Sequence, residues 1–211
     1  FDIEHNAYYK KNDDGFQPKS NGKSNYGKKK YPSKSKGYPK KNAQKPSIKI
    51  AFLGGLNEIG KNITLVECEN DIIIIDCGMA FPDGDMLGVD LVIPDFTYIE
   101  QNADRVKGII LTHGHEDHIG GLPFLLSKVS VPIYGTPLTL GLVGNKLKEH
   151  SLYNQSQLNV INAGQSIKLG CMKIDFIHVN HSIPDAVAFA IHTPGGWGAV
   201  LRYNGHEKEI S

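Results

Sequence analysis

The chain has 211 residues, of which 40% are hydrophobic, and a formal net charge of +1 at pH 7. This length suits one domain of ordinary size plus a tail. No apolar run approaches the length of a membrane span and no secretory signal is visible, so we expect no membrane partner and a cytoplasmic location. The three cysteines, Cys68, Cys77 and Cys171, form no C-x-x-C pair, which predicts reduced structural thiols rather than disulfides.

Charge is divided unevenly along the chain. Residues 1–46 carry 12 Lys and 4 Asp or Glu, a net of +8, whereas residues 47–211 carry 11 Lys or Arg and 18 Asp or Glu, a net of −7. The first segment has almost no aliphatic residues and cannot bury enough surface to offset its ordering entropy. We therefore predict a disordered, basic, low-complexity tail at 1–46 and a folded domain at 47–211.

The tail also interleaves lysines with tyrosines. Lysines neutralise phosphates and tyrosines stack on unpaired bases, so the tail is a candidate RNA-binding arm, with Lys28, Lys29 and Lys30 as possible contacts. A spacer that only keeps the protein soluble is an equally good interpretation.

Hydrophobic patterning after residue 46 predicts alternating strands and helices. The predicted strands are 48–53, 63–68, 72–75, 106–111, 131–134, 159–161, 166–169, 172–178 and 186–192, and the predicted helices are 99–104, 122–127 and 137–150. Strands that precede and follow helices, with hairpins early in the chain, indicate a layered α/β domain.

Two groups of acidic residues lie between these elements. Asp76 ends the buried strand 72–75, where a carboxylate is costly unless it has partners. We interpret it as a residue that orients a metal loop through hydrogen bonds, with a plain turn residue as the alternative. Asp83, Asp85 and Asp90 could bind calcium, although such loop acids are more often only solvated.

The most informative stretch is 113–118, which reads His-Gly-His-Glu-Asp-His directly after the strand 106–111. In an extended loop, His113 and His115 point to the same side, and Asp117 and His118 come where a helix should begin. Imidazole and carboxylate ligands at this spacing favour zinc, or manganese, over calcium. A chance His-rich surface loop would not be expected between a strand and a helix.

His181 lies in a polar turn after the strand 172–178 and is the natural fifth ligand. His178 and His192 fall within strand patterns, which favours core or surface positions over metal binding.

These motifs resemble a known family. H-x-H-x-D-H after a strand, preceded by Asp-x-Gly, resembles the metallo-β-lactamase fold with its αββα layers. The stretches 57–62, 81–90, 93–95 and 180–185 resemble the ribonuclease J family of β-CASP ribonucleases.

The resemblance implies that His113, His115 and His181 bind one zinc and that Asp117 and His118 bind a second. Asp117 and His118 would then be catalytic. It also implies cleavage of RNA from the 5′ end and internally, in RNA decay and rRNA maturation in the cytoplasm. Such relatives form homo-oligomers and RNA-decay assemblies, and some carry calcium near the loop 87–89.

The chain departs from the family in one respect. The family has Thr-Gly-Asp some 20 residues after His181, and its Asp bridges the two metals, but 197–206 contains no Asp. The β-CASP region would also lie beyond Ser211, and Phe1 is not a start methionine. We therefore expect an amino-terminal fragment with only the first part of the domain and with weak or no activity alone.

Two alternatives remain open at this point. One is a generic metallo-β-lactamase-fold hydrolase of thioesters or lactones. The other is a non-catalytic RNA- or partner-binding fragment dominated by its tail.

Overall fold

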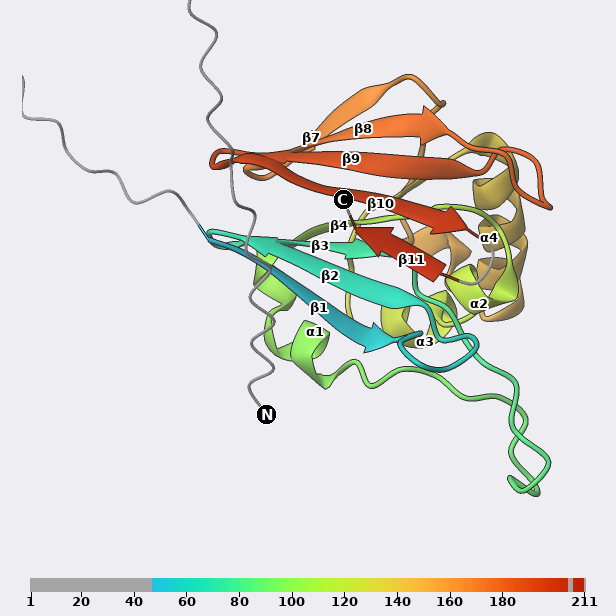
Figure 1. Cartoon of the computed structure of the whole chain (residues 1–211). Coiled ribbons are helices and arrows are strands. Elements are labelled where there is room, and N and C mark those ends of the chain that lie inside the picture. The colour runs from blue at the N-terminus through green and yellow to red at the C-terminus, as the bar shows by residue number, and fades with distance from the viewer. Residues whose placement is uncertain (1–46, 205–206, 211) are drawn as a thin grey trace, which may run out of the picture. The chain divides into compact units, whose positions relative to one another are not determined.

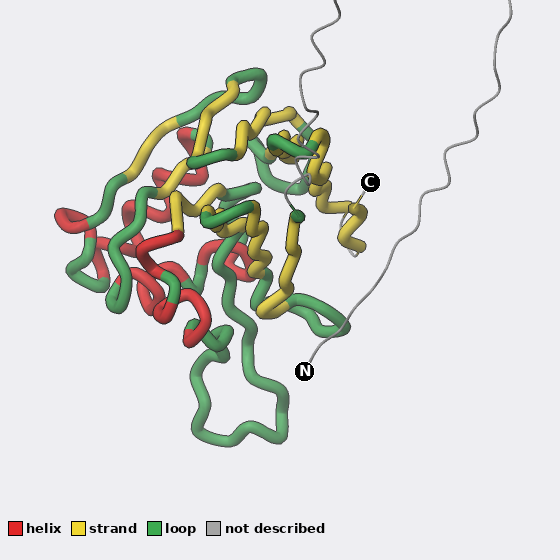
Figure 2. The backbone as a smooth tube through the Cα atoms, turned by 90° about the vertical axis from the view of Figure 1, so that its left-hand side faces the viewer, coloured by secondary structure: helices red, strands yellow, loops and turns green. Residues whose placement is uncertain are grey.

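A computed structural model describes residues 47–204 and 207–210 (Figure 1). The predicted tail at 1–46, with Lys28, Lys29 and Lys30, lies outside these residues. In the described part, two β-sheets stack on each other and helices cover the outer face of the first sheet (Figure 2). These are three layers of the expected αββα arrangement.

The first sheet has the strand order β1-β2-β3-β4-β5-β6. Its strands are β1 (Ile48–Gly54), β2 (Ile63–Cys68), β3 (Asp71–Ile75), β4 (Val106–Ile110), β5 (Ile133–Gly135) and β6 (Leu158–Val160). The first three run antiparallel, and the pairs from β3 to β6 are parallel. The carboxyl ends of β3 and β4 therefore lie at the same edge of the sheet, where the candidate site forms.

The second sheet is antiparallel throughout, in the order β11-β10-β9-β8-β7. Its strands are β7 (Ser166–Leu169), β8 (Met172–His178), β9 (Val187–Thr193), β10 (Gly196–Asn204) and β11 (Glu207–Ile210). The helices are α1 (Thr97–Gln101), α2 (Glu116–Ile119), α3 (Leu122–Leu126) and α4 (Pro137–Glu149). None of the helices in the described ranges is both long enough and apolar enough to span a bilayer.

The four isoleucines of β3 show how the layers are held together. Ile72 and Ile74 pack with the helices, whereas Ile73 and Ile75 pack with Phe176 and other residues of the second sheet. Side chains alternate between the two faces of a strand. A strand covered on both faces must therefore be apolar at every position, which explains the uninterrupted run.

Most predicted elements are confirmed to within one or two residues, and three strands, β2, β7 and β8, have the predicted bounds. The helix predicted at 99–104 is wrong in its extent: α1 ends at Gln101 and a separate 3-10 turn covers Ala103–Arg105. Both β10 and β11 were missed. The glycines at 195, 196 and 198 obscure a strand period at the start of β10, and β11 has only four residues.

Candidate metal centre

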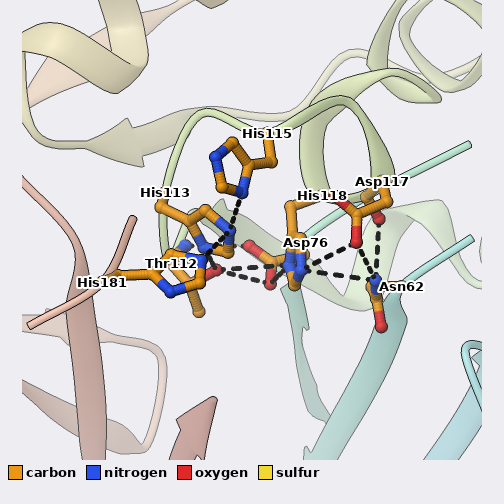
Figure 3. A network of polar contacts seen from close by, with 8 residues as sticks. All are labelled: Asn62, Asp76, Thr112, His113, His115, Asp117, His118 and His181. Carbon is orange, nitrogen blue, oxygen red and sulfur yellow. Dashed lines mark hydrogen bonds and ion pairs between the residues drawn. The ribbon is translucent and has the colours of Figure 1, made fainter. Parts of the chain in front are cut away.

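The candidate site lies at the carboxyl ends of β3, β4 and β8, which bring three separate stretches of chain together (Figure 3). His113 and His115 lie on the loop after β4, and α2 begins directly after them at Glu116. The helix thus begins next to Asp117 and His118, where the sequence predicts a helix start. His181 arrives from the turn after β8, 68 residues from His113.

Three histidines point their ring nitrogens at one another. Nε2 of His113 lies 3.1 Å from Nδ1 of His115 and 3.2 Å from Nε2 of His181. Ligand atoms of all three fall within 4.8 Å of one another, and they form the single such group of metal-binding side chains in the described ranges.

This group fits a bound cation. Zinc binds imidazole nitrogen at about 2.0–2.1 Å, so tetrahedral ligands lie about 3.3–3.4 Å apart, close to the distances from His113 to its two neighbours. A neutral imidazole has one ring nitrogen with a lone pair, and a single cation could bind that nitrogen of all three rings. The arrangement therefore has the chemistry of a metal site.

The surroundings of His113 and His181 lower their pKa values and so favour the neutral form of each ring. Burial, reinforced by the neighbouring His118, lowers the pKa of His113 to about 3. Burial and the nearby His115 also lower the pKa of His181. Both rings are thus neutral at pH 7, and a neutral imidazole is the form that binds a metal.

Asp76 is enclosed by donors. Its Oδ1 accepts the backbone N–H of Thr112 at 2.8 Å, and its Oδ2 accepts the Thr112 hydroxyl at 2.8 Å and Nδ1 of His118 at 2.7 Å. The residue is buried and adopts a left-handed backbone conformation, with φ 60°. Asp and Asn tolerate this conformation better than most residues. Asp76 thus holds the His118 ring at Nδ1, the nitrogen that faces away from Asp117.

Asp117 and His118 form a second half of the site, next to the histidine group. Nε2 of His118 lies 3.4 Å from Oδ2 of Asp117. Although burial opposes charge on the buried ring, the carboxylates of Asp76 and Asp117 raise the pKa of His118 to about 9. Burial likewise opposes charge on Asp117, but its contact with His118 lowers the carboxyl pKa overall.

Two residues that sequence reasoning did not assign to the site belong to this network. The Thr112 hydroxyl lies 2.9 Å from Nδ1 of His113, and the amide nitrogen of Asn62 reaches both Asp117 and His118. Both are polar and buried at a junction between a loop and an apolar strand. A polar residue in such a position needs a partner, and that signal was available in the sequence.

Backbone contacts hold the metal loop against the stretch after β3. Cys77 N–H donates to the His118 carbonyl at 2.8 Å, and Met79 N–H donates to Glu116 at 3.2 Å. A Cβ on Gly78 would lie 1.6 Å from the carbonyl oxygen of Asp117. The Asp-x-Gly sequence thus places a carboxylate under the site and leaves room for the loop to cross.

The remaining candidates lie apart from this site. Asp83, Asp85 and Asp90 are exposed and do not join a group of converging ligands within the described residues, so the calcium site stays a prediction. His192 pairs with Asp175 on the second sheet, and His178 is exposed at the end of β8.

Comparison with known proteins agrees with this arrangement. The family model described as "Metallo-beta-lactamase superfamily" matches residues 56–205. The chain belongs to the metallo-β-lactamase superfamily. This fold family implies a divalent-metal site, and the histidine group is where this member can hold the ion.

Among curated members of the superfamily, the chain is similar to ribonuclease J 1 of Streptococcus pyogenes, with 48% identity over 149 residues. That match covers 71% of this chain and 27% of the relative. Ribonuclease J of Helicobacter pylori is 47% identical over 153 residues, covering 72% of this chain and 22% of the relative. The chain thus spans about a quarter of the length of these relatives.

Among solved structures, a metallo-β-lactamase from Cronobacter sakazakii, a HARLDQ motif mutant, superposes with a TM-score of 0.51. Its sequence identity is 17%, and the match covers 74% of this chain and 60% of that one. At this identity the likeness supports the fold alone.

Proposed function

We propose that this chain is the metal-binding portion of a metal-dependent ribonuclease that hydrolyses phosphodiester bonds in RNA. The observation that carries the proposal is the similarity to ribonuclease J, at 47–48% identity over some 150 residues. Exonucleolytic and endonucleolytic cleavage, RNA decay, rRNA processing, homo-oligomers and a cytoplasmic location are parts of the same proposal.

We assign His113, His115 and His181 to one zinc ion, and Asp117 and His118 to a second. Zinc is supported by the three imidazole ligands, which it favours over purely oxygen ligands. When bound, such ions lower the pKa of a water molecule and offset negative charge on the phosphate.

The other residues of the network prepare these ligands. Asp76 accepts a hydrogen bond from Nδ1 of His118, so it leaves Nε2 as the ligand atom. The Thr112 hydroxyl donates to Asp76 and lies beside Nδ1 of His113, which restricts rotation of that ring. Ligands held in this way need little reordering when a cation enters.

We further propose that this chain alone has weak activity or none. A bridging carboxylate would be expected some 20 residues after His181, but 197–206 has no Asp. Without that ligand the second cation binds less tightly. Glu207 and Glu209 are the nearest acids, and their side chains lie outside the described part.

The test compares two substrates at high concentrations of the full chain with zinc or manganese. We expect slow hydrolysis of 5′-monophosphorylated RNA, no hydrolysis of a thioester or lactone, and loss of RNA cleavage in His113→Ala. His150→Ala, which changes a histidine at the end of α4, is the control and should retain activity. Thioester or lactone hydrolysis that exceeds RNA cleavage would instead support the generic hydrolase.

A further inference from the structure

The Asp117–His118 half of the site contains a third polar group that the metal-ligand motif does not include. Nδ2 of Asn62 donates to Oδ2 of Asp117 at 3.0 Å and lies 3.3 Å from Nε2 of His118 (Figure 3). Oδ2 of Asp117 and Nε2 of His118 lie 3.4 Å apart. These two atoms and Nδ2 of Asn62 therefore form a nearly equilateral triangle.

The distance between Oδ2 of Asp117 and Nε2 of His118 matches the distance between two ligands of one metal ion. Two ligands bound at about 2.0–2.2 Å to one ion lie roughly 3.0–3.5 Å apart. Asp117 and His118 are already that far apart, and the group facing both is an amide N–H. The amide places a partial positive charge beside the carboxylate, as a cation would, although more weakly.

Asn62 cannot easily leave this position. Its backbone N–H donates to the Asp117 carbonyl at 3.0 Å, and its own carbonyl accepts the N–H of Gly78 at 3.0 Å. Its Nδ2 also donates to the Asp117 carbonyl at 3.0 Å. The residue is 6% exposed and directly precedes β2. Asn62 is therefore hydrogen-bonded both to the metal loop, at Asp117, and to the segment after β3, at Gly78.

We propose that Asn62 is a positioning residue, which holds Asp117 and His118 at the spacing needed by a second divalent cation. Before the cation enters, the amide compensates the carboxylate of Asp117. When the cation enters, it takes over this compensation, and Asn62 retains its bond to the Asp117 carbonyl. The inference rests on the proposed metal site but is independent of the substrate.

Two substitutions separate this role from simple packing. Asn62→Ala removes the side-chain amide and its hydrogen bonds to Asp117, and leaves the backbone bond between residue 62 and the Asp117 carbonyl in place. Asn62→Asp keeps the size but places a second carboxylate beside Asp117, so the cation-free protein loses stability and gains it back when a cation binds. Asn102→Ala is the matched control, because its amide also donates to a backbone carbonyl, that of Tyr98, on α1.

The experiment titrates the full chain with Zn²⁺ at pH 8 by calorimetry and records thermal unfolding with and without the ion. We expect two binding events in the wild type, the second weaker. Asn62→Ala should weaken the second event about tenfold or more and leave the first within about twofold. Asn62→Asp should show a larger zinc-induced rise in Tm than the wild type. Asn102→Ala should change neither event.

The inference is overturned if both Asn62 variants bind zinc as the wild type does, or if zinc raises the Tm of all proteins equally. A wild type that binds a single zinc also overturns it. The first two results leave the proposed function intact as long as His113→Ala abolishes the first event, whereas a single zinc would also contradict the assignment of Asp117 and His118 to a second ion. Should Asn62→Ala fail to fold, the comparison of Asn62→Asp with the wild type decides alone.

Discussion

At the residue scale, Asp76 shows how one buried carboxylate organises a site without being one of its assigned ligands. Three donors converge on it, two from Thr112 and one from His118, and all lie within 2.8 Å. A carboxylate with these partners is stable in the interior, whereas one without them would not be. Its removal should thus affect both folding and metal binding.

We predict that Asp76→Asn binds zinc 10–100-fold more weakly than the wild type. An amide accepts less strongly and can turn its NH₂ group toward Nδ1 of His118, which disturbs the ring that presents Nε2. Competition with a chromophoric chelator measures the affinity. Asp71→Asn, at the opposite end of β3, is the control and should bind zinc normally. Equal affinities for Asp76→Asn and the wild type would contradict the assigned role.

At the scale of elements, the two sheets are joined at their far end by a polar contact. Oδ2 of Asp71 on β3 accepts the N–H of Cys171 at 2.7 Å, in the turn between β7 and β8, and Oδ1 lies 3.3 Å from Nζ of Lys107 on β4. Burial opposes charge on this carboxyl, but these two partners lower its pKa overall. The charged form therefore favours the folded state.

The pH dependence follows from the direction of this shift. A carboxyl whose pKa is lower in the folded state contributes stability above its unfolded pKa of about 3.9, and this contribution is lost as the pH falls through the folded value. Asp71→Asn should therefore be less stable than the wild type at pH 7, and the difference should shrink below about pH 4. Urea unfolding at pH 7 and pH 3.5 measures it. A difference that stays constant with pH would exclude this contribution.

The crossing of the metal loop over the segment after β3 gives a second test at this scale. Gly78→Ala places a methyl group where the Asp117 carbonyl oxygen lies, so the loop must move. We expect a loss of about 3 kcal/mol or more in the free energy of unfolding, together with weaker zinc binding. Gly141→Ala on α4, where a Cβ would meet nothing within 4 Å, should be neutral or stabilising by up to about 1 kcal/mol. Similar losses of stability in Gly78→Ala and Gly141→Ala would argue against the close contact between Gly78 and the Asp117 carbonyl.

At the scale of the whole molecule, charge is separated along the sequence, with a net of +8 in 1–46 and −7 in 47–211. An acidic body suits the binding of cations, whereas a polyanion such as RNA is attracted by the basic segment. The proposed ribonuclease would therefore capture substrate with one part of the chain and act on it with another.

Deletion of residues 1–46 tests this division. We expect the shortened chain to bind RNA more weakly at low salt and to show a shallower dependence of log affinity on log salt concentration. Its zinc affinity should not change, because every assigned ligand lies after residue 112. Filter binding over a salt series gives the slope. RNA binding that survives the deletion with the same slope would assign the contacts to the body.

The sequence by itself determined the layered α/β class and the ligand motif. The bounds of β2 and β8 could be predicted because their apolar residues follow the period of a strand. The ligand motif could be predicted because 113–118 concentrates its ligands within six residues. Tertiary structure alone decided that Asn62 lies beside Asp117, and that Asp76 contacts Thr112 as well as His118. Such contacts join residues 36–55 positions apart, and local periodicity carries no information about which distant polar groups will meet at the end of a sheet when its strands pair.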